Sequence, residues 1–575
     1  MRDIRSIGES PRSFVSPPTL PPNAPLPRSS PAPEPLGHAG RLIALLCVSA
    51  FLILSFWNFG APGLDDDEAV IGVTTGWIDL SPILHSFSFS HLPLMGYSNH
   101  AAMMCYWIFP FFKLLNTPFL ALRLSSLLFG LAALLLTFQL SRRLFGRSVA
   151  LLTLGLLAVH PNFLIGSRLG AHHGILLCLF STSSLLFFHR WWTDRRGSDF
   201  GLGFLCLGLG LSTFTYFLFW IGAIAATALL FAKKLFPPFR ARWKTLCAAG
   251  IVSFSVGAWP LLAAFHRQGM AEKVLEYISS SEQSQSRLTT FAVFSPRKSF
   301  RVLGDLLTGA DLRTAYWNDV SFWDFHARAA SYLLALALAF FWISRRSLFD
   351  KKHARPPASA LGLLSVIFFD ALLNSYQPSG KYGDHFLHLL PIVLLFTAAG
   401  LGDLFNAALR PGTRALGLAL AGGGLALSAM TVNVEYLFYL QKTGGVDFAS
   451  GAVHDLADWV QVKGYRSLVE NEPPRLTMKL WFLTSKKFET QQFTGHALFG
   501  QAPRNYPSPA ENFDALILDW KKSGRSGHAL SPSALKNLSS WRDARGRKLK
   551  LAAVFREKHG RPAYLVYEPR PPKQP

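Results

Sequence analysis

Apolar runs of about 15–20 residues recur along the chain from residue 42 to about residue 433, with short basic clusters between them. An α-helix needs about 20 apolar residues to cross the hydrocarbon core of a bilayer. Half of the 575 residues are hydrophobic and only 16% are charged, which is low for a soluble protein. The sequence therefore predicts a mainly α, polytopic membrane protein.

We predict about eleven transmembrane helices. They lie at residues 42–59, 124–141, 148–166, 173–189, 199–214, 217–233, 245–263, 329–344, 359–374, 386–402 and 414–433. Arg and Lys cluster in alternate connections, so the positive-inside rule places these connections and the N-terminus in the cytoplasm. The apolar stretch 101–115 is interrupted by Pro110 and Lys113, and counting it as a span would move the basic cluster at 142–147 outside. We interpret it as an interfacial helix on the outer side.

This arrangement divides the chain into three parts. Residues 1–40 are rich in Pro and Ser and lack an apolar signal core, which is typical of a disordered cytoplasmic tail and not of a cleaved signal peptide. Residues 41–433 form the transmembrane domain. Because the number of spans is odd, the loops 60–122 and 264–328 face outward, and so does everything after residue 433.

Residues 434–575 have the pattern of a small soluble α/β domain on the outer face. A helical pattern covers 452–462, and strand-like runs cover 513–518, 550–554 and 563–567. Together with the transmembrane part, this gives a plasma-membrane (inner-membrane) protein with a cytoplasmic N-terminus and an extracytoplasmic, periplasmic C-terminal domain.

The net charge of +23 does not indicate a nucleic-acid partner. The basic residues sit between apolar segments, where cytoplasmic loops require them, instead of forming a stripe that follows a phosphate backbone. Membrane lipids and phosphorylated lipid substrates are the expected anionic partners. The five cysteines lie in or beside apolar segments without a metal-binding or disulfide spacing.

Four consecutive carboxylates, residues 65–68, follow the first predicted span. Like charges at this spacing favour shared protons, a bound cation or a basic partner. Carboxylates at a membrane edge are functional-site candidates by default. A solvated acidic loop that helps to fix topology is the alternative interpretation.

The order of motifs around this run resembles the GT-C glycosyltransferases of family 39 type, which include protein O-mannosyltransferases and the aminoarabinose transferases that modify lipid A. The resemblance covers about residues 42–190 and continues more faintly to about residue 402. It rests on Asp67-Glu68, His91-Leu92-Pro93-Leu94, Ala121-Leu122-Arg123-Leu124, the basic segment 141–147, His160-Pro161, Ser167-Arg168, Lys381-Tyr382 and Leu390-Pro391.

The resemblance implies a GT-C fold and inverting transfer of a sugar from a polyprenyl-phosphate donor to an acceptor on the outer face. Such transfer needs a carboxylate that takes the proton of the acceptor hydroxyl, and cationic groups that stabilise the departing lipid phosphate. The family's Asp-Glu pair falls on Asp67-Glu68, so Asp67 is the expected base, with Asp66 and Glu68 close enough to substitute.

The expected substrate-binding residues are His91, Arg168, His173, Lys381 and Tyr382. Arg168 and Lys381 are predicted at the outer ends of spans, where a charged side chain is costly to draw deeper. Two positions depart from the family pattern. His91 replaces a lysine, and His173 stands where the family tends to place an aspartate. No cofactor is certain, and a divalent cation held near the acids is left open.

Two other function classes remain at this stage. A transporter or lipid flippase is the alternative, although no repeated set of spans or matching pair of broken helices supports it. A non-catalytic receptor or scaffold is the third. The sequence leaves open the sugar and the acceptor, which could be a lipid, a protein or a polysaccharide.

Overall fold

The computed structural model describes part of the chain. The described residues are 35–61, 63–64, 66–76, 88–89, 92–93, 95–97, 100–115, 117–170, 173–194, 196–214, 217–230, 239–240, 242–267, 387–408, 411–443, 450–470, 475–484, 489–492, 513–519, 547–558, 560 and 562–570. The side chains of Asp66 and Asp67 are among those outside this description.

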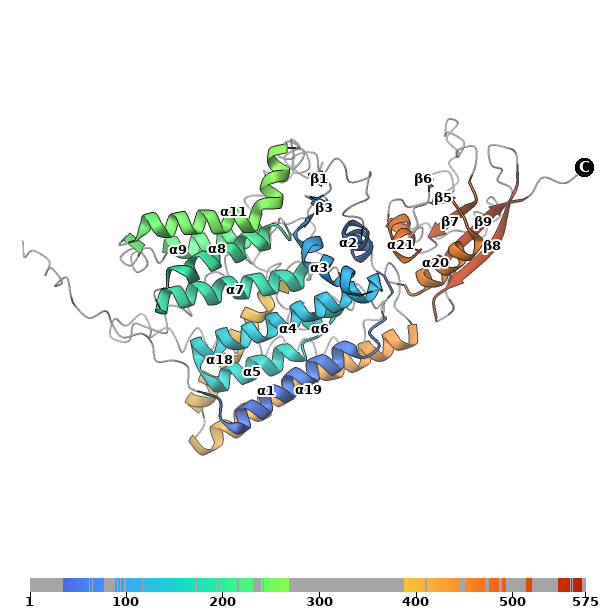
Figure 1. The fold of residues 1–575 in the computed structure, drawn as a ribbon. Helices are drawn as coiled ribbons and strands as arrows, with labels where there is room; N and C mark the ends of the chain where they lie inside the picture. Colours follow the sequence, from blue (N-terminus) through green and yellow to red (C-terminus); the bar gives the residue numbers. More distant parts are fainter. Residues whose placement is uncertain are drawn as a thin grey trace, which may run out of the picture.

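The helices stack side by side in the order α11, α8, α7, α4, α5, and α5 then contacts α1, α18 and α19 (Figure 1). Their bounds are α1 His38–Phe56, α4 Pro118–Phe145, α5 Arg147–Ala158, α7 His173–Asp194, α8 Gly197–Leu211, α11 Trp243–Arg267, α18 Leu390–Ala408 and α19 Pro411–Thr443. The bundle is therefore built mainly from neighbours in sequence, with α18 and α19 returning to its first helices.

Five of the described helices are long and apolar enough to cross a bilayer, namely α1, α4, α7, α11 and the one that contains α18. A sixth span results if the bent pair α5 and α6 (Pro161–Arg168) counts as one. The mainly α, multi-pass class is thus confirmed. The number of eleven spans stays a prediction, because spans 329–344 and 359–374 lie outside the described residues.

The span expected at 148–166 is not one straight helix. It breaks at Val159–His160, and α5 and α6 meet at an angle of 59°. Pro161 opens α6, because proline has no N–H to donate into the preceding turn and its fixed φ suits a first helical position. The bend carries the last residue of α6, Arg168, toward the loop that follows α1.

Two further details of the sequence prediction agree with the structure. The region 199–233 does form two short helices, α8 and α9 (Leu218–Leu230). The stretch 101–115 contains α3 (Met103–Leu114), which has Pro110 inside it. At about 1.5 Å per residue, twelve residues reach only about 18 Å, too short to cross a bilayer.

Close packing between α8 and α11 depends on glycine. A Cβ at Gly257 would lie 2.7 Å from the backbone nitrogen of Leu209, and one at Gly208 would lie 2.9 Å from the backbone nitrogen of Ala258. Small residues at such crossings let helix backbones approach, which is how helices gain van der Waals contact inside a bilayer. The pair α8–α11 is thereby held as a layer at one side of the bundle.

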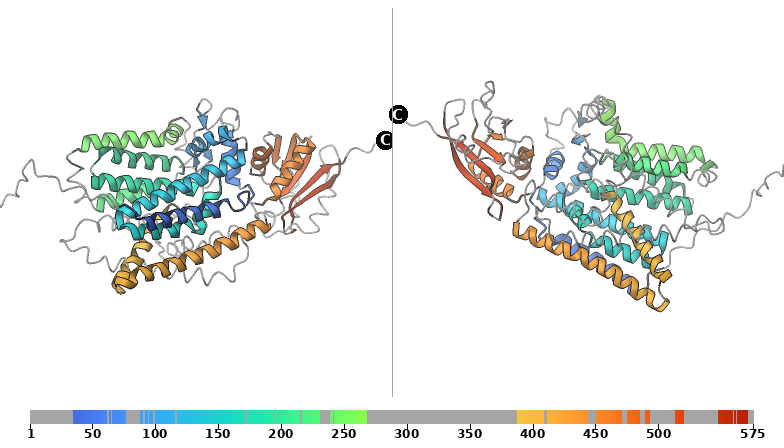
Figure 2. Two further views of the ribbon diagram at one scale, coloured as in Figure 1. Left: turned by 60° about the horizontal axis from the view of Figure 1, so that its bottom comes forward. Right: turned by 180° about the vertical axis from the view of Figure 1, so that it is seen from behind.

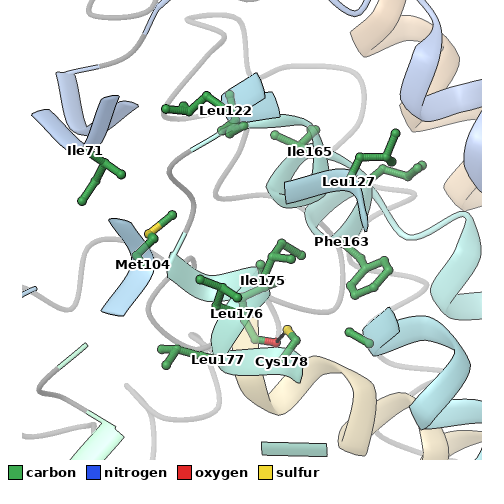
Figure 3. Close-up of a cluster of buried hydrophobic side chains, with 14 of the residues drawn as sticks. Ile71, Met104, Leu122, Leu127, Phe163, Ile165, Ile175, Leu176, Leu177 and Cys178 are labelled. Carbon is green, nitrogen blue, oxygen red and sulfur yellow. Dashed lines mark hydrogen bonds between the residues drawn. The ribbon is translucent and has the colours of Figure 1, made fainter. Parts of the chain in front are cut away.

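The hydrophobic core continues to the end of the bundle that holds the short helix α2 (Asp66–Gly76). Figure 3 shows Ile71 of α2, Met104 of α3 and Leu122 of α4 around the same region as Ile175, Leu176 and Leu177 of α7. The apolar side of α2 is thus anchored by helices far apart in sequence. Figure 1 places α2 and α3 at the end of the bundle nearest the C-terminal domain.

The C-terminal part forms one five-stranded mixed sheet, in the order β6-β5-β7-β9-β8. β5 pairs in parallel with β6 and β7, whereas β9 pairs antiparallel with β7 and β8. Helix α20 packs on β8 and β9, and α21 contacts both α20 and α2 (Figure 2). The bounds are α20 Ala452–Lys463, β5 Ser467–Glu470, α21 Arg475–Thr484, β6 Glu489–Gln492, β7 Ala515–Asp519, β8 Leu549–Arg556 and β9 Pro562–Pro569.

The predicted helix at 452–462 and strands at 513–518, 550–554 and 563–567 correspond to α20, β7, β8 and β9. The expected small α/β fold is therefore confirmed. The exact domain boundaries stay a prediction.

Candidate functional site

The acidic run begins a helix. Asp66 and Asp67 occupy the first turn of α2, directly after the loop 57–64. Carboxylates are stabilised in a first turn, because the unpaired backbone N–H groups and the helix dipole place positive charge there. The structure thus gives the two aspartates a defined backbone position, while their side chains lie outside the described part of the chain.

Glu68, the fourth acid, is buried and paired. Its carboxylate accepts a two-point contact from Arg123 of α4, with Nε at 3.2 Å from Oε1 and Nη2 at 3.1 Å from Oε2. Both side chains are almost fully excluded from solvent, at 0% exposure for Arg123 and 1% for Glu68. A planar guanidinium suits this fork geometry better than an ammonium would. The pair therefore fixes α2 onto α4.

The same guanidinium holds the loop before α2. Arg123 Nη1 donates to the carbonyl oxygen of Phe59 at 2.9 Å, and Nη2 donates to that of Gly63 at 3.3 Å. The Phe119 ring lies 4.2 Å from the guanidinium carbon, a cation–π distance. One buried arginine therefore joins α4 to both the loop and the helix that carry the acids.

A third contact reaches Glu68 from the segment after α6. The backbone N–H of Gly170 donates to Glu68 Oε1 at 2.5 Å. A Cβ at Gly170 would lie 2.9 Å from the backbone carbon of Leu122, so glycine is what allows the approach. Glu68 therefore links α2 to α4 and to the chain that follows α6.

Arg168 holds the other side of the loop. Its Nη2 donates to the carbonyl oxygens of Asn58 at 2.7 Å and Ala61 at 3.0 Å. The side chain is only 2% exposed, and its Nε and Nη1 are buried without a hydrogen-bond acceptor among the described residues. Buried guanidinium N–H groups normally find acceptors. Two nitrogen atoms of Arg168, which carry three N–H groups, are therefore without an acceptor among the described residues.

Backbone geometry in this loop is unusual at one residue. Asn58 has φ of +51°, and it is the one non-glycine residue with positive φ among the described positions. Asparagine tolerates this left-handed conformation better than most residues. The turn directs the Asn58 carbonyl toward both Arg168 and the backbone N–H of Ala61.

The loop and its two arginines form what we call the arginine clamp: Glu68, Arg123, Arg168 and the loop 57–64. Its described side chains contain one carboxylate and two guanidinium groups, so one positive charge is not balanced among them. Burying an unbalanced charge costs several kcal/mol, by order of magnitude, unless an anion lies nearby. Among the described side chains, the clamp therefore carries a net positive charge beside the first turn of α2, where Asp66 and Asp67 stand in the sequence.

The other predicted site residues have different placements. His173 begins α7, is 5% exposed and stacks on Phe214 at a ring-centroid distance of 4.2 Å. His91, Lys381 and Tyr382 lie outside the described residues. The structure thus brings Glu68 and Arg168 to one loop and places His173 in the core. The functional assignments of all these residues stay predictions.

A metal site is not found in the part of the chain that the structure describes. No group of three or more His, Cys, Asp or Glu side chains there could hold a metal ion. The side chains of residues 65–67 and His172 lie outside the described part of the chain.

Comparisons with known proteins agree on the architecture. Residues 99–259 match the family described as dolichyl-phosphate-mannose-protein mannosyltransferase. No curated protein matches the chain. ArnT from Cupriavidus metallidurans in its apo state is similar in structure, with a TM-score of 0.56, 14% sequence identity and coverage of 92% of this chain and 98% of that chain.

A second similar structure is the oligosaccharyltransferase of Archaeoglobus fulgidus in its apo form. Its TM-score is 0.52 at 12% identity, and the match covers 85% of this chain and 71% of that chain. The chain has the GT-C fold. The GT-C resemblance inferred from the sequence is therefore confirmed for this membrane protein at the level of fold.

Within this GT-C fold, Arg123 is the residue that the sequence analysis did not select as a site residue. A signal was present, because Arg123 lies in the apolar run that begins the predicted span 124–141. An arginine in such a run is costly unless it is paired. What the pattern could not supply was the partner, since Glu68 is 55 residues away.

Proposed function

We propose that the chain is an integral-membrane glycosyltransferase. It transfers a sugar from a polyprenyl-phosphate donor to an acceptor hydroxyl on the outer face of the plasma membrane, with inversion at the anomeric carbon. The observation that carries the proposal is the arginine clamp, which sets a buried, positively charged site next to two aspartates within a GT-C fold.

The comparisons support a lipid-phosphate donor. ArnT from Cupriavidus metallidurans has been solved bound to undecaprenyl phosphate, with a TM-score of 0.55 and 13% identity to this chain. The archaeal oligosaccharyltransferase AglB has been solved with an inhibitory peptide and a dolichol-phosphate, with a TM-score of 0.53. Both ligands belong to those proteins, and they motivate the class of donor that we assign here.

In the proposed reaction, Asp67 takes the proton of the acceptor hydroxyl as its oxygen attacks the anomeric carbon. The bond between the anomeric carbon and the phosphate oxygen breaks, and the polyprenyl phosphate leaves with the bonding electrons. The free N–H groups of Arg168 stabilise the charge that develops on that phosphate. Glu68 and Arg123 keep the first turn of α2 in place and do not enter the bond changes.

The decisive test is a transfer assay with purified protein in lipid nanodiscs. A sugar-charged polyprenyl phosphate is supplied with candidate acceptors, and free polyprenyl phosphate and glycosylated acceptor are both quantified. We expect both products in equal amounts and only in the presence of an acceptor. In sealed proteoliposomes, movement of the intact sugar-charged carrier between leaflets without release of free polyprenyl phosphate would instead identify a flippase and overturn the proposal.

Substituting Arg168 tests the assignment of the phosphate site. For Arg168→Gln we expect affinity for polyprenyl phosphate to fall about 10–150-fold, because charged hydrogen bonds are worth about 1.5–3 kcal/mol. Binding of the carrier lipid by the full-length protein in nanodiscs measures this directly.

Arg168→Lys is the matched variant, because it keeps the positive charge and loses the planar guanidinium with its paired N–H donors. Arg168→Lys should bind polyprenyl phosphate more weakly than the wild type and more tightly than Arg168→Gln. Because Arg168 also holds the loop carbonyls, thermal unfolding is recorded for each variant. Unchanged affinity for the carrier in folded Arg168→Gln would remove Arg168 from the phosphate site.

A further inference from the structure

The C-terminal domain touches the acidic helix directly. Phe482 of α21 is 7% exposed, and its ring lies against Gly72 of α2. A Cβ built at Gly72 would come within 2.6 Å of Phe482 Cδ2 and 3.0 Å of Cζ, far inside van der Waals contact. The absence of a side chain at Gly72 is therefore what lets the Phe482 ring pack onto α2.

The ring has a second neighbour on the membrane side. Phe482 lies 6.3 Å from Phe112 of α3, measured between ring centroids. Gly72 follows Glu68 by one helical turn, and residues four apart share a face of a helix. The contact from α21 is thus on the same side of α2 as the ion pair with Arg123.

Helix α20 makes an independent contact with the arginine clamp. A Cβ at Gly63 would lie 2.6 Å from the carbonyl carbon of Ser450, so the loop and the start of α20 meet backbone to backbone. His454 meets the Phe119 ring edge to face at 5.4 Å, and Phe119 also carries the Arg123 guanidinium. Burial and the charge of Arg123 lower the pKa of His454, so the neutral form is favoured at this contact.

We propose that Phe482 is a positioning residue of the transfer reaction: by packing on Gly72 it sets where α2, and with it the first-turn aspartates, stands relative to the membrane domain. In this proposal the C-terminal domain helps to hold the active site in place and is not a separate module. The proposal rests on the function proposed above.

The physical reason is the length of α2. A helix of eleven residues is marginal in isolation, so its position depends on the elements packed against it. The main described contacts of α2 are with α21, α3, α4 and the short strand β3 (Met95–Tyr97). A shift of about 1 Å in a reacting group can reduce the rate about 100-fold, so a loose α21 contact should affect turnover before it affects folding.

A bump-and-hole experiment in the full-length protein tests this. Gly72→Ala adds the colliding methyl, Phe482→Ala removes the ring, and the double variant combines the two. Gly424→Ala is the matched control, since Gly424 is also a helical glycine and has nothing within 4 Å of a built Cβ. Transfer rates, donor KM and hydrogen–deuterium exchange of residues 66–76 are measured in nanodiscs.

We expect Gly72→Ala to lower kcat about 10–100-fold with donor KM little changed, and to speed exchange in α2. The double variant should recover part of that loss, while Gly424→Ala should behave as wild type. If Gly72→Ala matches Gly424→Ala in both kcat and exchange, the positioning role is wrong. If wild-type protein shows no transfer, the proposed function fails. Faster hydrogen–deuterium exchange of α2 in Gly72→Ala than in wild type still reports separately on the Phe482–Gly72 contact.

Discussion

Replacing Asp67 by asparagine is expected to lower the rate of sugar transfer about 100–10,000-fold, because a general base contributes about that factor. Asparagine has nearly the same shape as aspartate but does not accept the proton of the acceptor hydroxyl. The variant should bind the charged carrier as wild type does, because the printed contacts of the arginine clamp run between Glu68, Arg123, Arg168 and backbone groups. Single-turnover transfer measured beside carrier binding separates the two effects.

Two matched variants complete that experiment. Asp66→Asn alters the neighbouring acid of the same helical turn and should cost less than Asp67→Asn. Asp194→Asn changes a partly exposed acid at the C-terminal end of α7, paired with Arg143 at 3.5 Å. That change should leave transfer as it is. Full activity of both Asp66→Asn and Asp67→Asn would rule out either aspartate as the base.

Breaking the Glu68–Arg123 pair is expected to produce the largest loss of stability. Removing one member of a buried ion pair leaves the other uncompensated, at a cost of about 3–5 kcal/mol. Glu68→Leu removes the carboxylate partner of Arg123, whose side chain is 0% exposed. Arg123→Met removes the guanidinium partner of Glu68 and the donors to the Phe59 and Gly63 carbonyls. Both single variants should unfold at clearly lower temperature in detergent and lose transfer activity.

The double variant Glu68→Leu with Arg123→Met distinguishes pairing from simple loss of packing. It should be less destabilised than the sum of the single variants, with a coupling of about 0.5–3 kcal/mol. Arg143→Gln breaks the pair with Asp194, whose members are 28% and 23% exposed, and should change stability by about 1 kcal/mol at most. Additive effects at Glu68 and Arg123 would contradict the ion pair as the source of stability.

These two predictions assign different roles to neighbouring acids. The family resemblance favours Asp67 as the base, with Asp66 and Glu68 close enough in the sequence to substitute for it. The structure gives Glu68 three hydrogen bonds, from Arg123 and Gly170, and leaves its side chain only 1% exposed. Held in this way, Glu68 fixes α2 to α4 and to the chain that follows α6.

The bend at Pro161 shows a similar limit. Hydropathy alone favours one span over 148–166, and the mean apolar character of α5 and α6 does support a membrane segment. Proline and the 59° bend redirect α6, and this change of direction brings Arg168 to the Asn58 and Ala61 carbonyls. The location of Arg168 at the end of a span was predictable, whereas its partners were not.

By itself the sequence determined the properties that depend on local composition: a mainly α membrane protein, a small C-terminal α/β fold and an acidic run beside the first span. Periodicity and hydropathy act over one helix or strand at a time, so they suffice for these. Only the tertiary structure decided that Arg123 neutralises Glu68, that Gly170 reaches the same carboxylate, and that Phe482 rests on Gly72. Those contacts join residues from 55 to several hundred positions apart, and a buried charge selects its partner by distance in space, which no local pattern encodes.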